Sequence, residues 1–248
     1  MKCLAILLTA ASLSTLSLAL AAPSKLQLKY FDLRGVAETS RVLLAIGGEE
    51  YEDVRFEIDP SNFQSAAFLA AKESGELKMN LNRAPVLVTQ DGTTIGQSKA
   101  IERFLARKFG LLGGSPDEEA VIDCIAEHCR DVKDAAMRKG FSNFTKGKTD
   151  EEKARDRSEW FEDDMPTMLK KIDDMVQEMG AEEGFAVGSA TSYADVAIWA
   201  LLRDCPPADA EDTSKAAVEC KALNAIADAI SANPGVSKWL NERPETMF

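Results

Sequence analysis

Hydrophobic and polar residues follow a strand–helix–strand pattern just beyond the N-terminal segment. Residues 25–31 and 51–58 alternate with a period of two, which is typical of half-buried strands. Between them, residues 35–46 carry apolar side chains at helical spacing, and Gly47 and Gly48 end that helix. A strand, a helix and a second strand in so short a segment predict a βαβ unit, whose strands should run parallel.

The next segment predicts a hairpin and another helix. Residues 84–88 and 93–95 fit two short strands, and the Asp91-Gly92 pair between them is a hairpin turn signal. Ser98 is expected to cap the helix that follows, because a serine hydroxyl can accept from the free backbone N–H groups of a first helical turn.

The second half of the chain has helical spacing throughout. Residues 117–139 and 149–179 predict two long helices. The second contains Pro166, which should bend it because proline lacks the N–H and clashes with the preceding turn. Ser192 and Asp195 form a reciprocal capping pair in front of an apolar run, which marks the start of a further helix.

These elements divide the chain into three parts. Residues 24–112 predict an α/β domain, and residues 115–248 predict an all-α domain. Residues 1–21 are typical of a signal or targeting peptide, because Lys2 precedes an apolar run that ends in an A-x-A-like cleavage pattern. The leader predicts secretion, or import into an organelle, with a cytosolic location as the alternative. No other segment has the ~20 apolar residues of a spanning helix, so no membrane insertion is expected after its removal.

Charge and residue counts exclude several classes of partner. Lysine and arginine number 29 against 41 aspartates and glutamates, a net charge of −12, so nucleic acid is not an expected partner. The single histidine, His128, excludes a multi-histidine zinc site, and no metal is expected. Cys205 and Cys220 either pair in an oxidising compartment or stay free thiols. Asn143 opens the one glycosylation sequon.

Four short motifs, in this order and spacing, resemble those of glutathione S-transferases of the tyrosine type and sigma-like class. They are LKYFDLRG at 28–35, APVL at 84–87, QSKAI at 97–101 and SYAD at 192–195. The stretch 233–244 also fits, so the resemblance covers residues 25–248. It implies a thioredoxin-like N-terminal domain, an all-α C-terminal domain and a homodimer. It also implies conjugation of reduced glutathione to a small hydrophobic electrophile held in a second pocket between the domains.

The reaction needs a thiolate, and a hydroxyl group that donates to sulfur favours this charged form. Tyr30 ends the first predicted strand and matches the catalytic tyrosine of the family. Gln97 and Ser98 match residues that bind the γ-glutamyl end, at a helix start that attracts anions. Pro85 is expected to be cis, which would leave the backbone of Ala84 free to pair with the cysteinyl backbone of glutathione.

Three further residues complete the site that the resemblance implies. Arg83 is expected to bind the glycyl carboxylate of glutathione. Phe63 aligns with a large residue of the family, and Glu127 with an acidic residue that reaches the glutathione amine of the partner subunit. Val36 departs from the pattern, because many tyrosine-type members have arginine there. The lost positive charge disfavours the thiolate unless Arg34 compensates.

Two alternatives to conjugation remain open. One is a non-catalytic structural protein or ligand carrier on the same fold, as in the lens crystallins of the sigma branch. Val36 favours that alternative, whereas Tyr30, Pro85 and Gln97 oppose it. The other is a glutathione-dependent isomerase or peroxidase, which would share the glutathione site and differ only in the second pocket.

Overall fold

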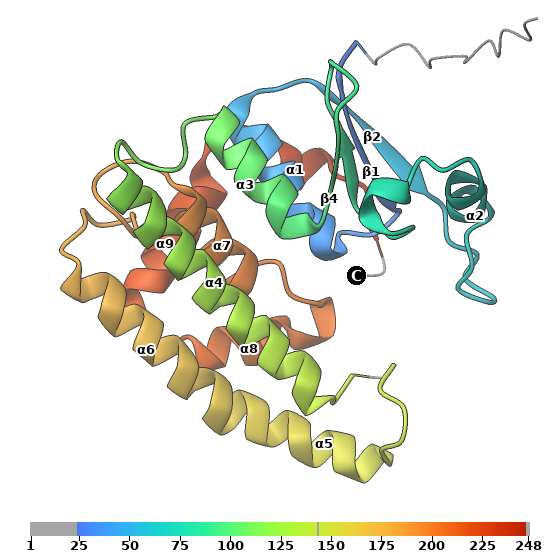
Figure 1. Ribbon diagram of the computed structural model, residues 1–248. Helices are drawn as coiled ribbons and strands as arrows, with labels where there is room; N and C mark the ends of the chain where they lie inside the picture. Colours follow the sequence, from blue (N-terminus) through green and yellow to red (C-terminus); the bar gives the residue numbers. More distant parts are fainter. Residues whose placement is uncertain (1–23, 143, 247–248) are drawn as a thin grey trace, which may run out of the picture.

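The computed structural model describes residues 24–142 and 144–246, and its first part is built on a four-stranded sheet of order β2-β1-β3-β4 (Figure 1). The strands are β1 (Leu26–Phe31), β2 (Tyr51–Phe56), β3 (Val86–Val88) and β4 (Thr94–Gly96). β1 and β2 are parallel, and β3 is antiparallel to both β1 and β4. The predicted βαβ unit and hairpin are therefore confirmed.

Alternate residues of the strands face two different sets of helices. Leu28 in β1 and Leu87 in β3 are fully buried in the main core, which α1 and α3 share. Phe56 and Val86 point to the opposite face, where they pack with Phe68 of α2. The helices of this part are η1 (Gly35–Ala37), α1 (Glu38–Gly47), α2 (Ala66–Glu73), η2 (Lys78–Asn80) and α3 (Ser98–Lys108).

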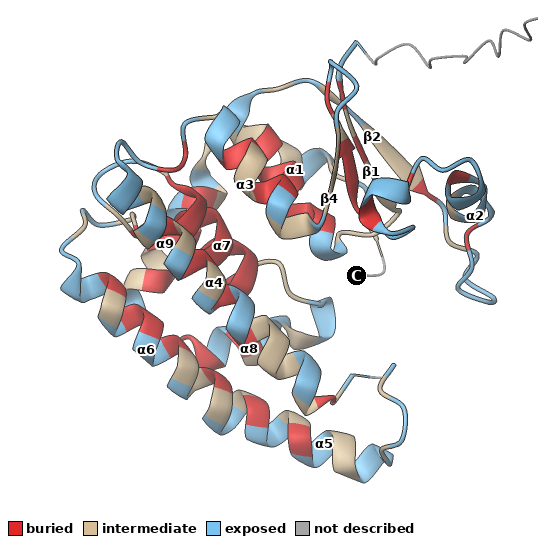
Figure 2. Ribbon diagram, viewed as in Figure 1, coloured by how far each residue is buried: buried red, intermediate tan, exposed pale blue. Residues whose placement is uncertain are grey.

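The regular elements described in the second part are all helices, and they are centred on α7. All ten residues of α7 are buried, and α4 and α9 pack on either side of it (Figure 2). The helices are α4 (Pro116–Lys139), α5 (Asp150–Glu159), η3 (Trp160–Asp164), α6 (Met165–Glu178), α7 (Tyr193–Leu202), η4 (Pro207–Asp209), α8 (Ala210–Ala216), α9 (Lys221–Ala232) and α10 (Pro234–Glu242). The fold class predicted from the sequence is thus confirmed.

Two local features of the helical part follow from the sequence. The Asp195 carboxylate accepts from the backbone N–H of Ser192 at 2.6 Å and from its hydroxyl at 2.7 Å, which confirms the predicted capping pair. Near Pro166 the long helix is interrupted by η3, a π-helical turn directly before α6. A proline cannot donate to the preceding turn, and one wider turn accommodates that missing bond.

The two parts pack together through α1, which contacts α7 and α10. Gly235 near the start of α10 allows the closest approach, because a Cβ there would lie 2.2 Å from the carbonyl oxygen of Ala45. Within the described residues, no helix is both long and apolar enough to cross a bilayer. The predicted leader and the Asn143 sequon lie outside the described residues.

Candidate active site

The register of the sheet brings three separate segments to one edge. Lys29 of β1 pairs with Val86 of β3, which pairs in turn with the last residue of β4. One position further along these neighbouring strands are Tyr30, Pro85 and Gln97. Three residues that are far apart in the sequence, and that the sequence analysis assigned to one site, are therefore neighbours at the same edge.

Tyr30 is held so that its hydroxyl proton stays available. Among the described residues its O–H has no hydrogen-bond acceptor, so it can donate elsewhere. Burial raises the pKa of Tyr30, although the Val36 amide and the charge of Arg41 partly oppose that rise. The phenol is therefore protonated at neutral pH. Gly35 has a φ of +43°, and a Cβ there would lie 2.7 Å from the Tyr30 oxygen, so the turn needs glycine.

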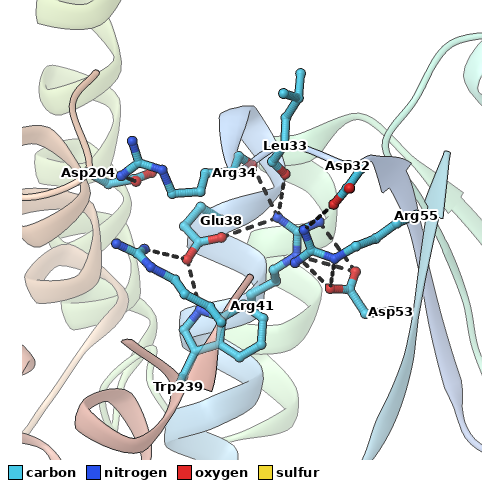
Figure 3. Close-up of polar contacts among 10 residues, drawn as sticks. Asp32, Leu33, Arg34, Glu38, Arg41, Asp53, Arg55, Asp204 and Trp239 are labelled. Carbon is cyan, nitrogen blue, oxygen red and sulfur yellow. Dashed lines mark hydrogen bonds and ion pairs between the residues drawn. The ribbon is translucent and has the colours of Figure 1, made fainter. Parts of the chain in front are cut away.

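Arg41 of α1 is a buried cation behind this turn, and the sequence analysis missed it. Its guanidinium donates to the carbonyl oxygen of Leu33 at 2.8 Å, to Asp53 at 3.1 Å and to Glu38 at 3.2 Å (Figure 3). Arg41 therefore positions the turn, and its charge lowers the pKa of Tyr30. The sequence did contain one sign of its importance, because an arginine is unusual on the apolar face of a helix such as α1.

Arg34 does not replace the missing arginine, a compensation that the sequence left open. Its guanidinium turns toward the helical domain, where it donates to Asp204 at 3.1 Å (Figure 3). It also donates to the carbonyl oxygen of Cys205 at 3.3 Å. Arg34 therefore ties the turn after β1 to the loop after α7. Its charge is neutralised there by an aspartate whose side chain is 7% exposed.

Asn80 joins the segment that contains Pro85 to the segment that contains Gln97. Its buried amide nitrogen donates to the carbonyl oxygens of Pro85 at 2.9 Å and Arg83 at 3.1 Å. Its amide oxygen accepts from the backbone N–H of Gln97 at 3.0 Å. One side chain thus positions both loops. The sequence analysis missed Asn80 because nothing in the local pattern separates it from the exposed Asn82 two residues later.

The peptide bond between Ala84 and Pro85 is cis, as predicted. The preceding Arg83 is exposed, and its described side-chain contact is a long one of 3.5 Å to the carbonyl oxygen of Asn80. Its guanidinium is therefore free to bind a carboxylate at this edge.

The expectation that Ser98 caps α3 is wrong. The helix begins at Ser98 itself, and Gln97 takes the capping position with a φ of 67° and no side-chain capping bond. Among the described residues the Ser98 hydroxyl has no hydrogen-bond partner. The first-turn N–H groups of α3 and this hydroxyl together form the start of a helix that can bind an anion.

Phe63 and Glu127 have their described contacts elsewhere. Phe63 is 57% exposed, and its ring packs edge-on against Phe144 of the helical domain with the centroids 6.0 Å apart. Glu127 on α4 forms ion pairs with Arg103 and, at 2.7 Å, with Arg130 of its own chain. Neither side chain has a described contact with Tyr30, Pro85 or Gln97.

Cys124, Cys129, Cys205 and Cys220 are free thiols, so the pairing of Cys205 with Cys220 that the sequence left open is not formed. In the part of the chain that the structure describes, no three histidine, cysteine, aspartate or glutamate side chains are placed to hold a metal ion.

Comparison with known proteins decides the family. The sequence pattern of the glutathione S-transferase N-terminal domain matches residues 26–107, and that of the C-terminal domain matches residues 135–243. A Caenorhabditis elegans protein named probable glutathione S-transferase 5 is 32% identical over 223 residues, which cover 90% of this chain and 98% of that protein. This chain belongs to the glutathione S-transferase family. It is an enzyme of this class, and its co-substrate is glutathione.

Other similar proteins include a prostaglandin synthase as well as further glutathione S-transferases. Chicken (Gallus gallus) hematopoietic prostaglandin D synthase is 31% identical over 233 residues, which cover 89% of this transferase and 97% of the synthase. Among solved structures, the glutathione S-transferase Na-GST-3 of the hookworm Necator americanus, described as monomeric, has a TM-score of 0.70 and 27% identity. That match covers 90% of this chain and the whole of the hookworm chain at 100%.

Proposed function

We propose that the edge formed by Tyr30, Pro85 and Gln97 binds reduced glutathione, and that the enzyme conjugates it to small hydrophobic electrophiles. One observation carries this proposal. The register of β1, β3 and β4 places a phenol with an available proton beside a free backbone segment and a helix start. These three groups are suited to a thiol, a peptide backbone and a carboxylate, all of which glutathione carries.

Each part of the tripeptide has a matching group at the edge. The γ-glutamyl carboxylate binds at the start of α3, with Ser98 and the Gln97 side chain, where the helix dipole favours an anion. The cysteinyl backbone pairs with Ala84 in the manner of an added strand. Arg83 binds the glycyl carboxylate. This orientation directs the cysteinyl sulfur toward Tyr30.

Tyr30 then favours the thiolate over the thiol. Its O–H donates to sulfur, and that bond is much stronger when sulfur carries the negative charge. The thiol proton passes to solvent, and the thiolate attacks the electrophile. Since the activating group is a tyrosine and not a cysteine or serine, we assign the enzyme to the tyrosine-type, sigma-like class.

A glutathione-dependent isomerase is the second candidate, and the 31% identity to the chicken prostaglandin D synthase favours it. The same thiolate would add to a substrate and leave again after rearrangement. The two activities are separated by the product: conjugation consumes glutathione, whereas isomerisation returns it unchanged.

The test measures conjugation of glutathione to a chlorodinitrobenzene by the wild type, Tyr30→Phe and Tyr51→Phe. Tyr30→Phe should lower kcat/KM about tenfold or more, since the donor to the thiolate is lost. Tyr51 is the matched control. It lies at the opposite end of the sheet, in register with Leu26, and its buried hydroxyl has no hydrogen-bond partner among the described residues. Its substitution should leave kcat/KM within about twofold of wild type.

Three outcomes of this test have different meanings. Equal losses in both variants would contradict the role of Tyr30. Glutathione binding without turnover by the wild type would favour the carrier or structural alternative. Substrate isomerisation with glutathione recovered would favour the second candidate.

We further propose that the chain forms a homodimer and that its leader is removed. The dimer would bring Glu127 toward the glutathione amine of the partner, provided that it leaves Arg103 and Arg130. Sedimentation that shows only a monomer at micromolar concentration would contradict the dimer. N-terminal sequencing of the protein from its native source tests the leader, and a mature protein that still begins at Met1 would contradict secretion or import.

A further inference from the structure

The carboxylate of Glu38 joins the C-terminal helix α10 to the turn after β1. Its Oε1 atom accepts from the indole N–H of Trp239 at 2.8 Å and from the guanidinium of Arg243, directly after α10, at 2.7 Å. Its Oε2 atom accepts from Arg41 at 3.2 Å (Figure 3). Because Glu38 is completely buried, these three donors take the place of water around its carboxylate.

One nitrogen of Arg41 is shared between this carboxylate and the backbone of the turn. The Nη1 atom of a guanidinium carries two N–H groups, but here it has three acceptors within hydrogen-bond distance. They are the carbonyl oxygens of Leu33 at 2.8 Å and Arg34 at 3.3 Å, and Glu38 at 3.2 Å. The shortest of these bonds is made to the turn. The bond to Glu38 is longer than the roughly 2.7–2.9 Å of a typical charge-assisted pair.

The two donors from the C-terminal end account for this division. Trp239 and Arg243 both bind Oε1, and they hold the Glu38 carboxylate back from Arg41. Without Arg243, this buried carboxylate would have one cation left, and opposite charges attract strongly where water is excluded. Glu38 would then take a larger share of the Arg41 Nη1 atom. The two carbonyl groups of the turn would lose that share.

The position of the turn affects Tyr30 through Gly35. Gly35 lies so close to the Tyr30 hydroxyl that a Cβ there would lie 2.7 Å from the phenolic oxygen. Leu33 and Arg34, whose carbonyl groups Arg41 holds, directly precede Gly35 in the sequence. A shift of these carbonyl groups therefore moves the backbone that contacts the Tyr30 hydroxyl. The groups assigned to bind the tripeptide lie in another segment, residues 83–98.

We propose that Arg243 is a positioning residue for thiolate formation. By holding Glu38 back from Arg41, it keeps the turn after β1 where the Tyr30 hydroxyl can donate to the glutathione sulfur. This inference rests on the proposed function of the Tyr30 edge. It assigns part of the activation of glutathione to the end of the chain, through a contact that spans 205 residues of sequence. The expected effect is on kcat and not on KM, because the tripeptide is bound by other segments.

The first test measures conjugation of glutathione to a chlorodinitrobenzene by full-length Arg243→Met. This change should lower kcat about tenfold and leave KM for glutathione within about twofold. Arg243→Lys, which keeps a cation, should recover most of the lost kcat. Lys238→Met is the matched control, because Lys238 is an exposed lysine of α10 with no ion pair among the described residues. It should leave kcat and KM within about twofold of wild type.

Ionisation of the bound thiol provides a readout that a general loss of stability would not move. The ultraviolet absorbance of the thiolate is followed across pH with the enzyme saturated with glutathione. The pH at which half of the bound thiol is ionised should rise by about one unit in Arg243→Met, which corresponds to a tenfold lower thiolate fraction near neutral pH. It should not change in Lys238→Met. Because this measurement needs no turnover, a wild type that binds the thiolate without conjugating it would contradict the proposed function alone.

A double variant tests whether Arg243 acts through Glu38. In Glu38→Gln the charge that competes for Arg41 is absent, so adding Arg243→Met should lower kcat by less than about twofold further. Losses that multiply in the double variant would overturn the inference. So would an unchanged kcat or an unchanged thiol ionisation in Arg243→Met, and these single-variant results decide the question if Glu38→Gln does not fold. A wild type that bound no glutathione would overturn both this inference and the proposed function.

Discussion

Arg41 of α1 and Lys133 of α4 are a buried and a partly buried cation, and they differ in how they are bonded. Arg41 lies behind the turn, is fully buried and donates to two carboxylates and to the carbonyl oxygen of Leu33. Lys133 lies on the helical-domain side and has no direct partner among the described residues. Its pKa is lowered by burial.

This difference separates a charge that holds the fold from one that is unfavourable in the free protein. A buried cation whose donors are all bonded is locked in place, and removing it leaves its partners without compensation. A cation left without a partner destabilises the free protein and can interact with a ligand that brings an acceptor. Predictions that test stability and activity separately can therefore test this distinction.

The largest expected effect is on Arg41. Arg41→Met should lower the free energy of unfolding by about 3–5 kcal/mol, because Glu38, which is completely buried, loses an ion-pair partner and the Leu33 carbonyl loses its donor. Trp239 and Arg243 would still bind Glu38, at 2.8 and 2.7 Å, which keeps the loss within this range. Urea unfolding measures the change.

The matched control for Arg41 is Arg107→Met, because the side chain of Arg107 is 68% exposed and pairs with Glu119 on the surface. That change should alter the unfolding free energy by less than about 1 kcal/mol. If the two variants unfolded at the same urea concentration, the buried network would not stabilise the fold as described.

Asn80 is the neutral counterpart of Arg41, buried and bonded on both sides of its amide. Asn80→Ala should lower the free energy of unfolding by about 1–3 kcal/mol, since the Gln97 N–H and the Pro85 carbonyl oxygen both lose their partner. It should also raise KM for glutathione, because the two loops lose their shared attachment. Steady-state kinetics tests this, with Asn241→Ala at an exposed site of α10 as the control. An unchanged KM would show that the loops hold their positions without Asn80.

The smallest effect on the free energy of unfolding is expected for Lys133→Met, which should raise it. The folded pKa of Lys133 lies below its ordinary value of 10.5, so between these two values the unfolded chain binds more protons and stability rises with pH. Below that interval the buried charge destabilises the fold. Lys133→Met should therefore be more stable than wild type at neutral pH, and the difference should narrow as pH rises toward 10.5.

Urea unfolding at several pH values measures this difference for Lys133→Met and for a control, Lys170→Met, at an exposed lysine of α6. A variant less stable than wild type at neutral pH would mean that the Lys133 ammonium has a stabilising partner in the folded chain. The contrast with Arg41 would then be lost.

Much of the fold was predictable because its signals are local. The period-two alternation of β1 and β2, the Asp91-Gly92 turn and the Ser192–Asp195 pair each act within a few residues. The bend expected at Pro166 was placed close to the observed π-helical turn, but its form depends on how the two adjoining helices pack. Ser98 was assigned as a cap, although the backbone of Gln97 takes that position, because the loop before α3 is held by the distant Asn80.

By itself, the sequence determined the α/β and all-α parts, the tyrosine at the end of β1 and the X-Pro bond before β3, since each is specified by neighbouring residues or by a short motif. Only the tertiary structure decided which side chains support them. Arg34 binds Asp204 and Arg41 lies beneath the turn, and these partners come from segments brought together by burial of the interface between α1 and the helical domain. Partner choice across such distances follows packing and desolvation, which no local pattern encodes.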